Sequence, residues 1–334
     1  MKKTPFVSIL ICTFNGSKKI EKCLRSLINQ NYPKNKFELI IVDDGSTDNT
    51  IEVVLKFPVV LVKHQKNKGI ATARNTGLMK SHGEIIVNID DDCVMDKNWL
   101  KNLIKAYDTE SVMGAGGVLI LPNNPSIVDE YCYHVGYGNP TPILLGKSNN
   151  IVERFWNYLH VNFTNPQSKY INGSLVFEFP TINSSFRKKY LTRINGWNEL
   201  FTTSSEDLDI CRRLKNRYPK LDFVVMPKAK LIHKQDLTLL KFLSKEYNRG
   251  KLRKKYYTIK NQIPPYFPFP ILFILISIII VLLKLSVIII LFIPFLLYPW
   301  WIIRAFNQKR VKILLFPYLQ LLHEEATVLG MLIN

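Results

Sequence analysis

The chain has 334 residues, of which 47% are hydrophobic, and it carries a formal net charge of +19. These values exclude a disordered or collagen-like chain and indicate one large domain or two smaller ones. A charge of this size is typical of a nucleic-acid-binding protein. The distribution of the basic residues along the sequence, however, decides which class of partner is expected.

Much of the positive charge lies beside the most apolar stretch of the sequence. Residues 241–262 carry eight basic residues and one acidic residue, whereas the first 240 residues keep a charge of +9. Residues 271–303 contain a single charged residue, Lys284. A basic juxtamembrane segment next to a long apolar stretch is typical of a membrane-bound protein. We therefore expect membrane lipid, and no nucleic acid, as a partner.

The apolar stretch predicts a membrane hairpin over residues 263–303. A straight helix of its 33 most apolar residues would be about 50 Å long, against a hydrocarbon core of about 30 Å. Two short helices that turn near Lys284 fit this thickness, and basic residues on both sides place both ends in the cytoplasm. Because the turn is tight and Pro294 and Pro299 would interrupt the second helix, a re-entrant hairpin in one leaflet is the alternative. Residues 304–334 are expected to form an amphipathic helix.

The start of the chain and its cysteines indicate a cytoplasmic location. The charged start leads into only a short apolar run, so no signal peptide is expected. The cysteines are odd in number and lack metal-ligand spacing, which is typical of reduced thiols. They are Cys12, Cys23, Cys93, Cys132 and Cys211.

The first half of the chain alternates predicted strands and helices. In chain order, strands are expected at residues 6–12, 37–42, 59–63 and 84–89, each followed by a helix. This alternation indicates an α/β fold whose mostly parallel sheet is covered by helices. Ligands bind at the carboxyl ends of the strands in such sheets, so residues that follow the strands are candidate site residues.

Three consecutive aspartates, Asp90, Asp91 and Asp92, follow the fourth expected strand. Adjacent carboxylates repel one another, so they need solvent, helix N-termini or a cation. Asp90 and Asp92 lie on one side of an extended segment and suit Mg²⁺ or Mn²⁺ that bridges a diphosphate. A solvated loop that caps the next helix is an equally good interpretation.

Asp43 and Asp44 end the second expected strand. They fit a turn before a helix N-terminus, or carboxylates that bind a nucleotide base or ribose. Taken alone, these two residues favour the turn.

Glu206, Asp207 and Asp209 open a further predicted helix. The helix dipole favours acidic residues there in any case, but the same position suits a general base. Arg212 and Arg213 either pair with these carboxylates or face a phosphate.

Together these residues resemble the family 2 glycosyltransferases, in family order over roughly residues 5–250. The resemblance implies a GT-A fold for a catalytic domain over residues 1–240, a nucleotide-diphosphate sugar donor, Mg²⁺ or Mn²⁺, and inversion at the anomeric carbon. The motifs that carry it are Thr13-Phe14-Asn15, Val42-Asp43-Asp44-Gly45-Ser46-Thr47-Asp48, Asn67-Lys68-Gly69, Ala73-Arg74-Asn75, Gly83-Glu84, Asp90-Asp91-Asp92, Asn195-Gly196-Trp197-Asn198-Glu199 and Glu206-Asp207-Leu208-Asp209.

The resemblance also implies roles in donor binding. Asp43 and Asp44 would recognise the base and ribose, and Thr13 and Asn15 would line the same pocket. Arg74 would lie near the diphosphate.

For the metal, the resemblance implies the pair Asp90 and Asp92, with Asp92 in direct contact and Asp91 in the donor site. His233 follows a predicted strand and would reach the metal or the diphosphate. The alternative for His233 is a histidine that is only packed at a strand end.

On the acceptor side, Asp207 would take the proton of the acceptor hydroxyl, with Glu206 beside it. Asn183 and Trp197 would contact the sugar or the acceptor. Residues 111–169 lack a recognisable pattern and are expected to hold loops that determine specificity.

We therefore expect an inverting glycosyltransferase that adds one sugar to a lipid-linked saccharide or nascent polysaccharide at the cytoplasmic membrane face. The Gln-x-x-Arg-Trp motif of processive synthases is absent from the sequence, which favours a single transfer. The alternative is a polyprenyl-phosphate sugar synthase, whose phosphate acceptor is already ionised and needs no base. A sugar nucleotidyltransferase would need a Gly-rich phosphate loop after the first strand, which Thr13-Phe14-Asn15-Gly16 is not.

Overall fold

The structure is a computed structural model that describes residues 4–139, 141–142, 150–163, 174–202, 205–233, 238–260 and 267–333. Residues 261–262 of the predicted basic segment and 263–266 of the predicted hairpin lie outside this range. The chain divides into two compact units. The first comprises Met1–Pro125, Gly136–Lys147 and Gln167–Lys234, and the second comprises Ser126–Val135, Ser148–Pro166 and Gln235–Asn334.

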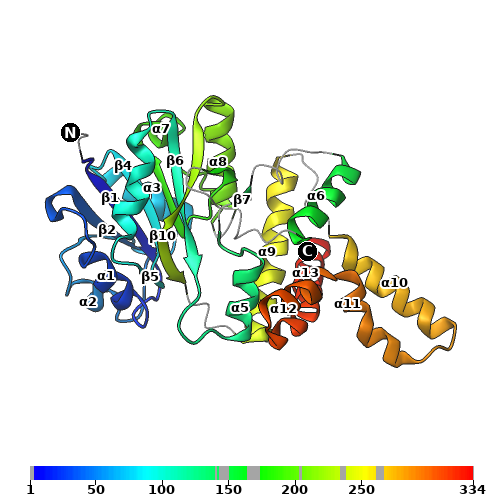
Figure 1. Ribbon diagram of the computed structural model, residues 1–334. Helices are drawn as coiled ribbons and strands as arrows, with labels where there is room; N and C mark the ends of the chain where they lie inside the picture. The colour runs from blue at the N-terminus through cyan, green and yellow to red at the C-terminus, as the bar shows by residue number, and fades with distance from the viewer. Residues whose placement is uncertain are drawn as a thin grey trace. The chain divides into compact units, whose positions relative to one another are not determined.

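The first unit begins with four parallel strands, as the sequence predicts (Figure 1). β2 lies between β3 and β1, and β4 lies on the other side of β1. Apolar side chains are buried along β1, β2 and β4, which fits a sheet that is covered on both faces. The elements are β1 (Val7–Thr13), α1 (Ile20–Ile28), β2 (Phe37–Asp43), α2 (Thr50–Val54), β3 (Val60–Lys63), α3 (Ile70–Lys80) and β4 (Ile85–Asp90).

The second half of the sheet is mixed, not mostly parallel. β9 lies between β4 and β6 and is antiparallel to both, whereas β10 is parallel to β6. The order across the sheet is β3-β2-β1-β4-β9-β6-β10-β8-β7, and β5 pairs with β10. The added elements are β5 (Cys93–Met95), α4 (Trp99–Ile104), β6 (Val112–Ile120), β7 (Thr141–Pro142), β8 (Ser174–Glu178), β9 (Asn183–Arg187), α7 (Lys188–Arg193), α8 (Glu206–Arg217) and β10 (Asp222–His233).

Strand β6 lies within residues 111–169, where the sequence has no recognisable pattern. Its glycines hide the alternating apolar pattern that marks a strand in sequence. A Cβ atom at Gly114 would lie 2.9 Å from the rings of both Phe186 and Phe223, so the neighbouring strands supply the apolar groups. The strand is therefore specified by aromatic residues more than 70 positions away.

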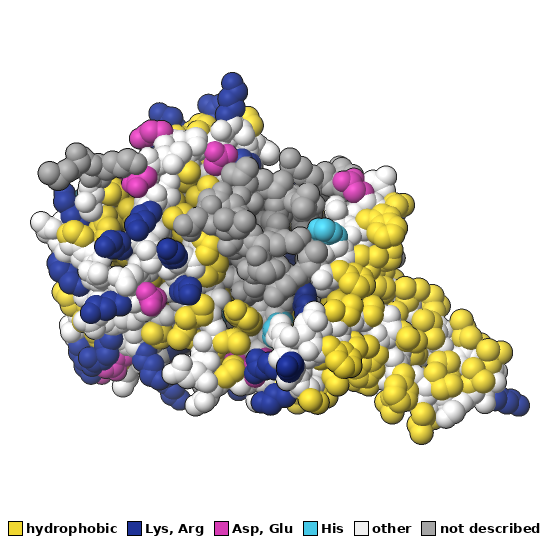
Figure 2. Space-filling view, in the orientation of Figure 1, with side chains coloured by type: hydrophobic (Ala, Val, Ile, Leu, Met, Phe, Trp, Pro, Cys, Tyr) yellow, Lys and Arg dark blue, Asp and Glu magenta, His cyan; other side chains and the backbone are white. Residues whose placement is uncertain are grey.

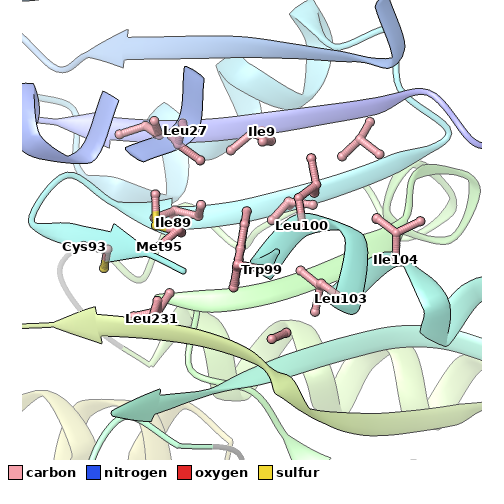
Figure 3. Close-up of a cluster of buried hydrophobic side chains, with 14 of the residues drawn as sticks. Ile9, Leu27, Ile89, Cys93, Met95, Trp99, Leu100, Leu103, Ile104 and Leu231 are labelled. Atoms are coloured by element: carbon pink, nitrogen blue, oxygen red, sulfur yellow. The ribbon is translucent and has the colours of Figure 1, made fainter. Parts of the chain in front are cut away.

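Two apolar layers form the core of the first unit, one on each face of the sheet. On one face α4 places Trp99 and Leu100 against Ile9, Ile89 and Leu231 from three different strands (Figure 3). All five side chains are buried. This burial, at about 25 cal/mol per Å² of apolar surface, fixes the strand ends that carry the acidic residues.

The second unit is helical throughout the residues that the structure describes. Its buried contacts include two carboxylates: Glu324 accepts hydrogen bonds from Tyr158 and Tyr298, and Glu246 lies 3.0 Å from His323. Burying carboxylates is tolerated because each is hydrogen-bonded. Outside residues 268–297, its α-helices are α5 (Ile127–His134), α6 (Ile151–Phe163), α9 (Leu239–Ile259), α12 (Trp300–Gln308) and α13 (Phe316–Leu332).

The chain turns near Lys284, and the predicted membrane hairpin stays a prediction. Helix α10 (Pro268–Leu282) is followed by a turn, a 3₁₀ segment η5 (Val287–Phe292) and α11 (Ile293–Leu297). Pro294 opens α11 and Pro299 precedes α12, so both prolines interrupt the second arm as expected. Figure 2 shows hydrophobic side chains crowded over this hairpin.

Within the described ranges, no single helix has both the length and the apolar composition needed to cross a membrane. Two consecutive segments, Val287–Leu297 and Trp300–Gln308, together have the necessary length and apolar composition. The chain is bent by 73° between them.

Helices α9 and α13 approach each other through two glycines. A Cβ atom on Gly330 would lie 1.9 Å from the carbonyl oxygen of Tyr247, and one on Gly250 would lie 2.2 Å from that of Thr327. Neither carbonyl can move without bending its helix. The crossing therefore requires glycine on both helices.

Substituting Gly330→Ala should lower the free energy of opening of α9 and α13 by about 1–3 kcal/mol, since the added methyl group forces the helices apart. Hydrogen–deuterium exchange of the α9 and α13 amides would measure this change. Leu329→Ala, at a side chain that is 48% exposed, is the control and should change opening by less than about 0.5 kcal/mol. Equal exchange in the two variants would contradict the glycine requirement.

Candidate active site

The carboxyl ends of β1, β4 and β10 bring several predicted site residues together. The Thr13 hydroxyl donates to Asp91 at 2.5 Å, and His233 Nε2 lies 3.3 Å from Asp92 Oδ1. Arg74 Nη2, from α3, lies 3.6 Å from Asp90 Oδ1. Residues that are 220 positions apart in sequence thus form one polar cluster at this edge of the sheet.

Asp91 is the buried member of the acidic triplet. It accepts from Thr13 and forms an ion pair of 2.7 Å with Lys19, and only 5% of its surface is exposed. Burial raises the pKa of Asp91, although the Lys19 ammonium and the Thr13 hydroxyl each lower it. The contacts seen here connect the end of β4 to β1 and α1, and its predicted role in the donor site stays a prediction.

Asp92 and His233 are placed so that both could bind one metal ion. The Asp92 carboxylate is 30% exposed, and its oxygen and the imidazole nitrogen are 3.3 Å apart, close enough to be neighbouring ligands. Carboxylate and imidazole together suit Mn²⁺. Among the described residues no group of three or more His, Cys, Asp or Glu side chains could hold a metal ion. A divalent cation at this pair would therefore need oxygen ligands from a bound diphosphate and water.

Arg74 joins the acidic triplet to the start of α8. Its Nη1 donates to Glu206 Oε1 at 2.5 Å, and Thr181 donates to the same oxygen at 3.3 Å. Arg74 and Glu206 are 4% and 5% exposed. Arg74 therefore holds the first turn of α8, which carries Asp207, close to Asp90.

Asp207 occupies the first turn of α8, as expected from the sequence. Its Oδ1 accepts from the Leu208 backbone N–H at 2.8 Å, and Ser205 before it has a φ of 69°. A left-handed backbone at a serine marks a strained helix start, which is common at functional sites.

Two loops form the region predicted to bind the base and ribose. The Asn15 N–H donates to the Ser46 hydroxyl at 2.8 Å, and Asn15 Oδ1 accepts from the Thr47 N–H at 2.9 Å. Asp43 is fully buried beneath them. The loop after β1 is thus fixed to the loop after β2, which joins Asn15 to the segment that begins with Asp43.

The Asp44 carboxylate is engaged within the protein. It accepts from the backbone N–H groups of Lys68 and Gly69, both at 2.9 Å, and lies 2.7 Å from His64 Nδ1. His64 in turn contacts the Thr76 hydroxyl at 3.0 Å. These contacts hold the loop that leads into α3, and the predicted ribose contact stays a prediction.

Asn183 and Trp197 lie inside the unit. Asn183 Oδ1 accepts from the Trp99 indole at 2.9 Å, and its amide donates to the Ala229 carbonyl at 3.4 Å. The backbone N–H and C=O of Trp197 both pair with the Asn75 amide. Both residues are at most 3% exposed, so these contacts explain their positions without a sugar or acceptor, and their predicted roles stay untested.

Three residues of the site were missed by sequence reasoning: Lys19, His64 and Thr181. Nothing in the sequence separates Lys19 from Lys18, and the partners of His64 and Thr181 are known only once the strands are assembled. The structure also decides between the two interpretations of Arg213. Its guanidinium pairs with Asp209 at 2.6 Å and donates to the carbonyls of Ile194 and Gly196.

The family model described as glycosyl transferase family 2 matches residues 8–177, which is half of the chain and includes the acidic triplet. The chain belongs to this family. The match ends before β9 and α8, so it does not test the assignments of Asp207 and His233.

Three curated relatives are similar over parts of the chain. Glycosyltransferase AglE of Haloferax volcanii is 33% identical over 38% of this chain and 44% of AglE. The dolichyl N-acetyl-alpha-D-glucosaminyl phosphate 3-beta-D-2,3-diacetamido-2,3-dideoxy-beta-D-glucuronosyltransferase of Methanococcus voltae is 31% identical over 34% of this chain and 39% of its own length. The poly(ribitol-phosphate) beta-N-acetylglucosaminyltransferase TarP of Staphylococcus aureus is 35% identical over 35% of this chain and 38% of its own length. The chain thus matches less than half the length of each relative.

A solved structure is similar over more of the chain. It is the mannosyltransferase PcManGT of Pyrobaculum calidifontis in complex with GDP-Man and Mn²⁺, with a TM-score of 0.54 at 18% sequence identity. The similar region covers 79% of this chain and 67% of the mannosyltransferase chain. At this identity the similarity supports the fold alone. The first unit therefore has a GT-A-like mixed sheet with helices.

Arg74→Met should lower the free energy of unfolding by about 3–5 kcal/mol, because it leaves the Glu206 carboxylate buried without its cation. Urea unfolding of the ligand-free protein would measure this loss. The double variant Arg74→Met/Glu206→Leu should recover most of it, since no unpaired charge remains.

Arg25→Met is the surface control for this experiment. Arg25 pairs with Glu21 at 2.7 Å, but their side chains are 65% and 45% exposed. Its removal should cost about 0–1 kcal/mol. An equal cost for Arg74→Met and Arg25→Met would mean that the buried pair does not hold α8.

Proposed function

We propose that the protein is an inverting glycosyltransferase that moves one sugar from a nucleotide-diphosphate sugar to a hydroxyl group. The acceptor is a lipid-linked saccharide or a nascent polysaccharide at the cytoplasmic face of the cell membrane. The observation that carries this proposal is the chain of contacts from Asp90 through Arg74 to Glu206, which brings the donor residues next to the candidate base Asp207.

The relatives support this substrate class. The name of the Methanococcus voltae protein specifies a dolichyl-linked sugar phosphate acceptor, and that of TarP specifies a poly(ribitol-phosphate). The solved mannosyltransferase structure is a complex with GDP-Man and Mn²⁺. Both names thus specify an acceptor that is carried on a lipid or is a polymer.

In the proposed reaction, each part of the site has one task. Arg74 contributes positive charge beside Asp90, where the donor diphosphate would bind, and Glu206 keeps this arginine in place. Asp207 accepts the proton of the acceptor hydroxyl as its oxygen attacks the anomeric carbon, while the nucleoside diphosphate leaves from the opposite face. Asp92 and His233 would hold Mn²⁺ or Mg²⁺, which when bound stabilises the negative charge of the diphosphate.

The location at the membrane is part of the same proposal. The exposed apolar side chains of α10 and η5 and the basic residues of α9 support attachment through the hairpin. Helix α10 has 15 residues, about 22 Å, which is shorter than the hydrocarbon core of about 30 Å. A hairpin of this length reaches the far side of the bilayer only where the bilayer is locally thinned.

Nucleotide-sugars should raise the melting temperature of the protein only when Mn²⁺ is present. Ligand at 100 times its dissociation constant stabilises by about 2.7 kcal/mol, which a thermal-shift screen detects readily. Asp92→Asn should abolish the Mn²⁺ dependence, whereas Glu110→Gln, at an exposed carboxylate, should preserve it. If no nucleotide-sugar stabilises the protein in a metal-dependent manner, the donor site is wrongly assigned.

Asp207→Asn should lower kcat by about 10²–10⁴-fold, because the amide cannot accept the proton of the acceptor hydroxyl. Donor binding, measured by the same thermal shift, should be unchanged. Glu52→Gln, at an exposed carboxylate of α2, is the matched control and should retain full turnover.

The second candidate function is a polyprenyl-phosphate sugar synthase, and the Asp207→Asn variant separates it from the first. A phosphate acceptor is already ionised near neutral pH, so its attack needs no general base. Unchanged turnover in Asp207→Asn with intact donor binding would favour this second function.

A further inference from the structure

Helix α10 is apolar on most of its surface. Ile274, Leu275 and Ile276 are 52%, 51% and 37% exposed, although successive residues of an α-helix point about 100° apart. The only polar side chain of α10 is Ser277, whose hydroxyl donates to the Phe273 carbonyl within the helix at 2.7 Å. A helix that lies flat in the interface keeps one polar face, and α10 has none. Its composition instead suits insertion into hydrocarbon.

The backbone hydrogen bonds at the tip of the hairpin also suit an apolar environment. The Lys284 N–H donates to the Val281 carbonyl and the Leu285 N–H donates to the Ile280 carbonyl, both at 3.0 Å. These bonds close the end of α10, so they satisfy backbone groups that hydrocarbon could not. Lys284 has a φ of 53°, a conformation in which glycine would be less strained. A lysine therefore occupies the tip at a position where the backbone favours glycine.

The length of the exposed part of α10 sets how deep this lysine can lie. The 12 residues from Ile271 to Leu282 extend about 18 Å, which exceeds half of a hydrocarbon core of about 30 Å. With the helix along the membrane normal, the tip lies about 12 Å from the far headgroups and about 18 Å from the near ones. A lysine in hydrocarbon extends its ammonium group toward the closer polar region, with local thinning of the bilayer.

We propose that the α10–η5 hairpin enters the bilayer from the cytoplasmic side and that Lys284 binds lipid phosphates of the opposite leaflet. The occupant of this apolar surface is thus the lipid bilayer, with an anionic headgroup at the tip. This inference rests on the membrane attachment proposed above. It adds the depth to which the hairpin enters the bilayer and the residue, Lys284, that contacts the headgroups there.

Single-cysteine labelling in the full chain tests this depth. Ser286→Cys places a thiol beside the tip and leaves Lys284 in place, Ser277→Cys places one in the middle of α10, and Lys312→Cys places one at an exposed basic position after the hairpin. The protein is expressed in bacterial cells, and a charged, membrane-impermeant thiol reagent is applied to right-side-out and to inverted membrane vesicles. The unsubstituted chain gives the background from its five native cysteines.

The proposal expects a different pattern at each position. The cysteine at position 286 should react only from the outer side, the one at 277 from neither side, and the one at 312 only from the cytoplasmic side. Adding Lys284→Leu to the Ser286→Cys variant should abolish the outer-side labelling, whereas Lys284→Arg should keep it.

Two results would overturn the proposal. Reaction of position 286 from the cytoplasmic side, or from neither side, would mean that the hairpin lies along the surface or ends inside the hydrocarbon. Recovery of the chain outside the membrane fraction, for example as a complex through the apolar hairpin, would refute membrane attachment itself. Labelling is measured only on protein in the membrane fraction. A wrong insertion depth and a lack of membrane attachment therefore give different results.

Discussion

The buried ion pair between Arg74 and Glu206 is the contact on which the arrangement of the candidate site depends. It connects α3, from the parallel half of the sheet, to α8, which precedes β10 of the mixed half. Neither charge can be buried alone, so the two halves are correctly placed only when both helices are in position. The acidic triplet then lies beside a cation that belongs to the protein, and the candidate base is held at the same edge of the sheet.

The sequence predicted the parallel half of the fold well because each of its strands is a continuous apolar run that ends in acidic or polar residues. It failed for β6 and β9, since the glycines of β6 and the polar residues Asn183, Ser184 and Ser185 of β9 lack a strand pattern. Both strands are specified by their neighbours: Tyr107 donates to Ser185 at 2.8 Å, for example. The local sequence pattern therefore identifies strands that contain their own apolar side chains. It misses strands whose apolar contacts come from neighbouring elements.

For the site, motif order correctly grouped the residues at one sheet edge but did not reveal what holds them. Arg74 and Asp44 were assigned to ligands, whereas the structure shows that each also has a protein partner that orders a neighbouring segment. Such partners come from distant positions, so they are not visible in a linear motif. In the second unit, likewise, the glycine crossing of α9 and α13 depends on carbonyl positions that a linear motif does not reveal.

The position of β9 has a consequence for how the protein is made. β9 pairs with β4 on one side and β6 on the other, yet about 90 residues of chain separate β4 from β9. During synthesis the parallel half can form early, and β4 then presents an unpaired edge until β9 emerges. This open edge makes the nascent chain prone to wrong pairing with other strands. Folding of the sheet is complete only after β10, which ends at His233, has also emerged from the ribosome.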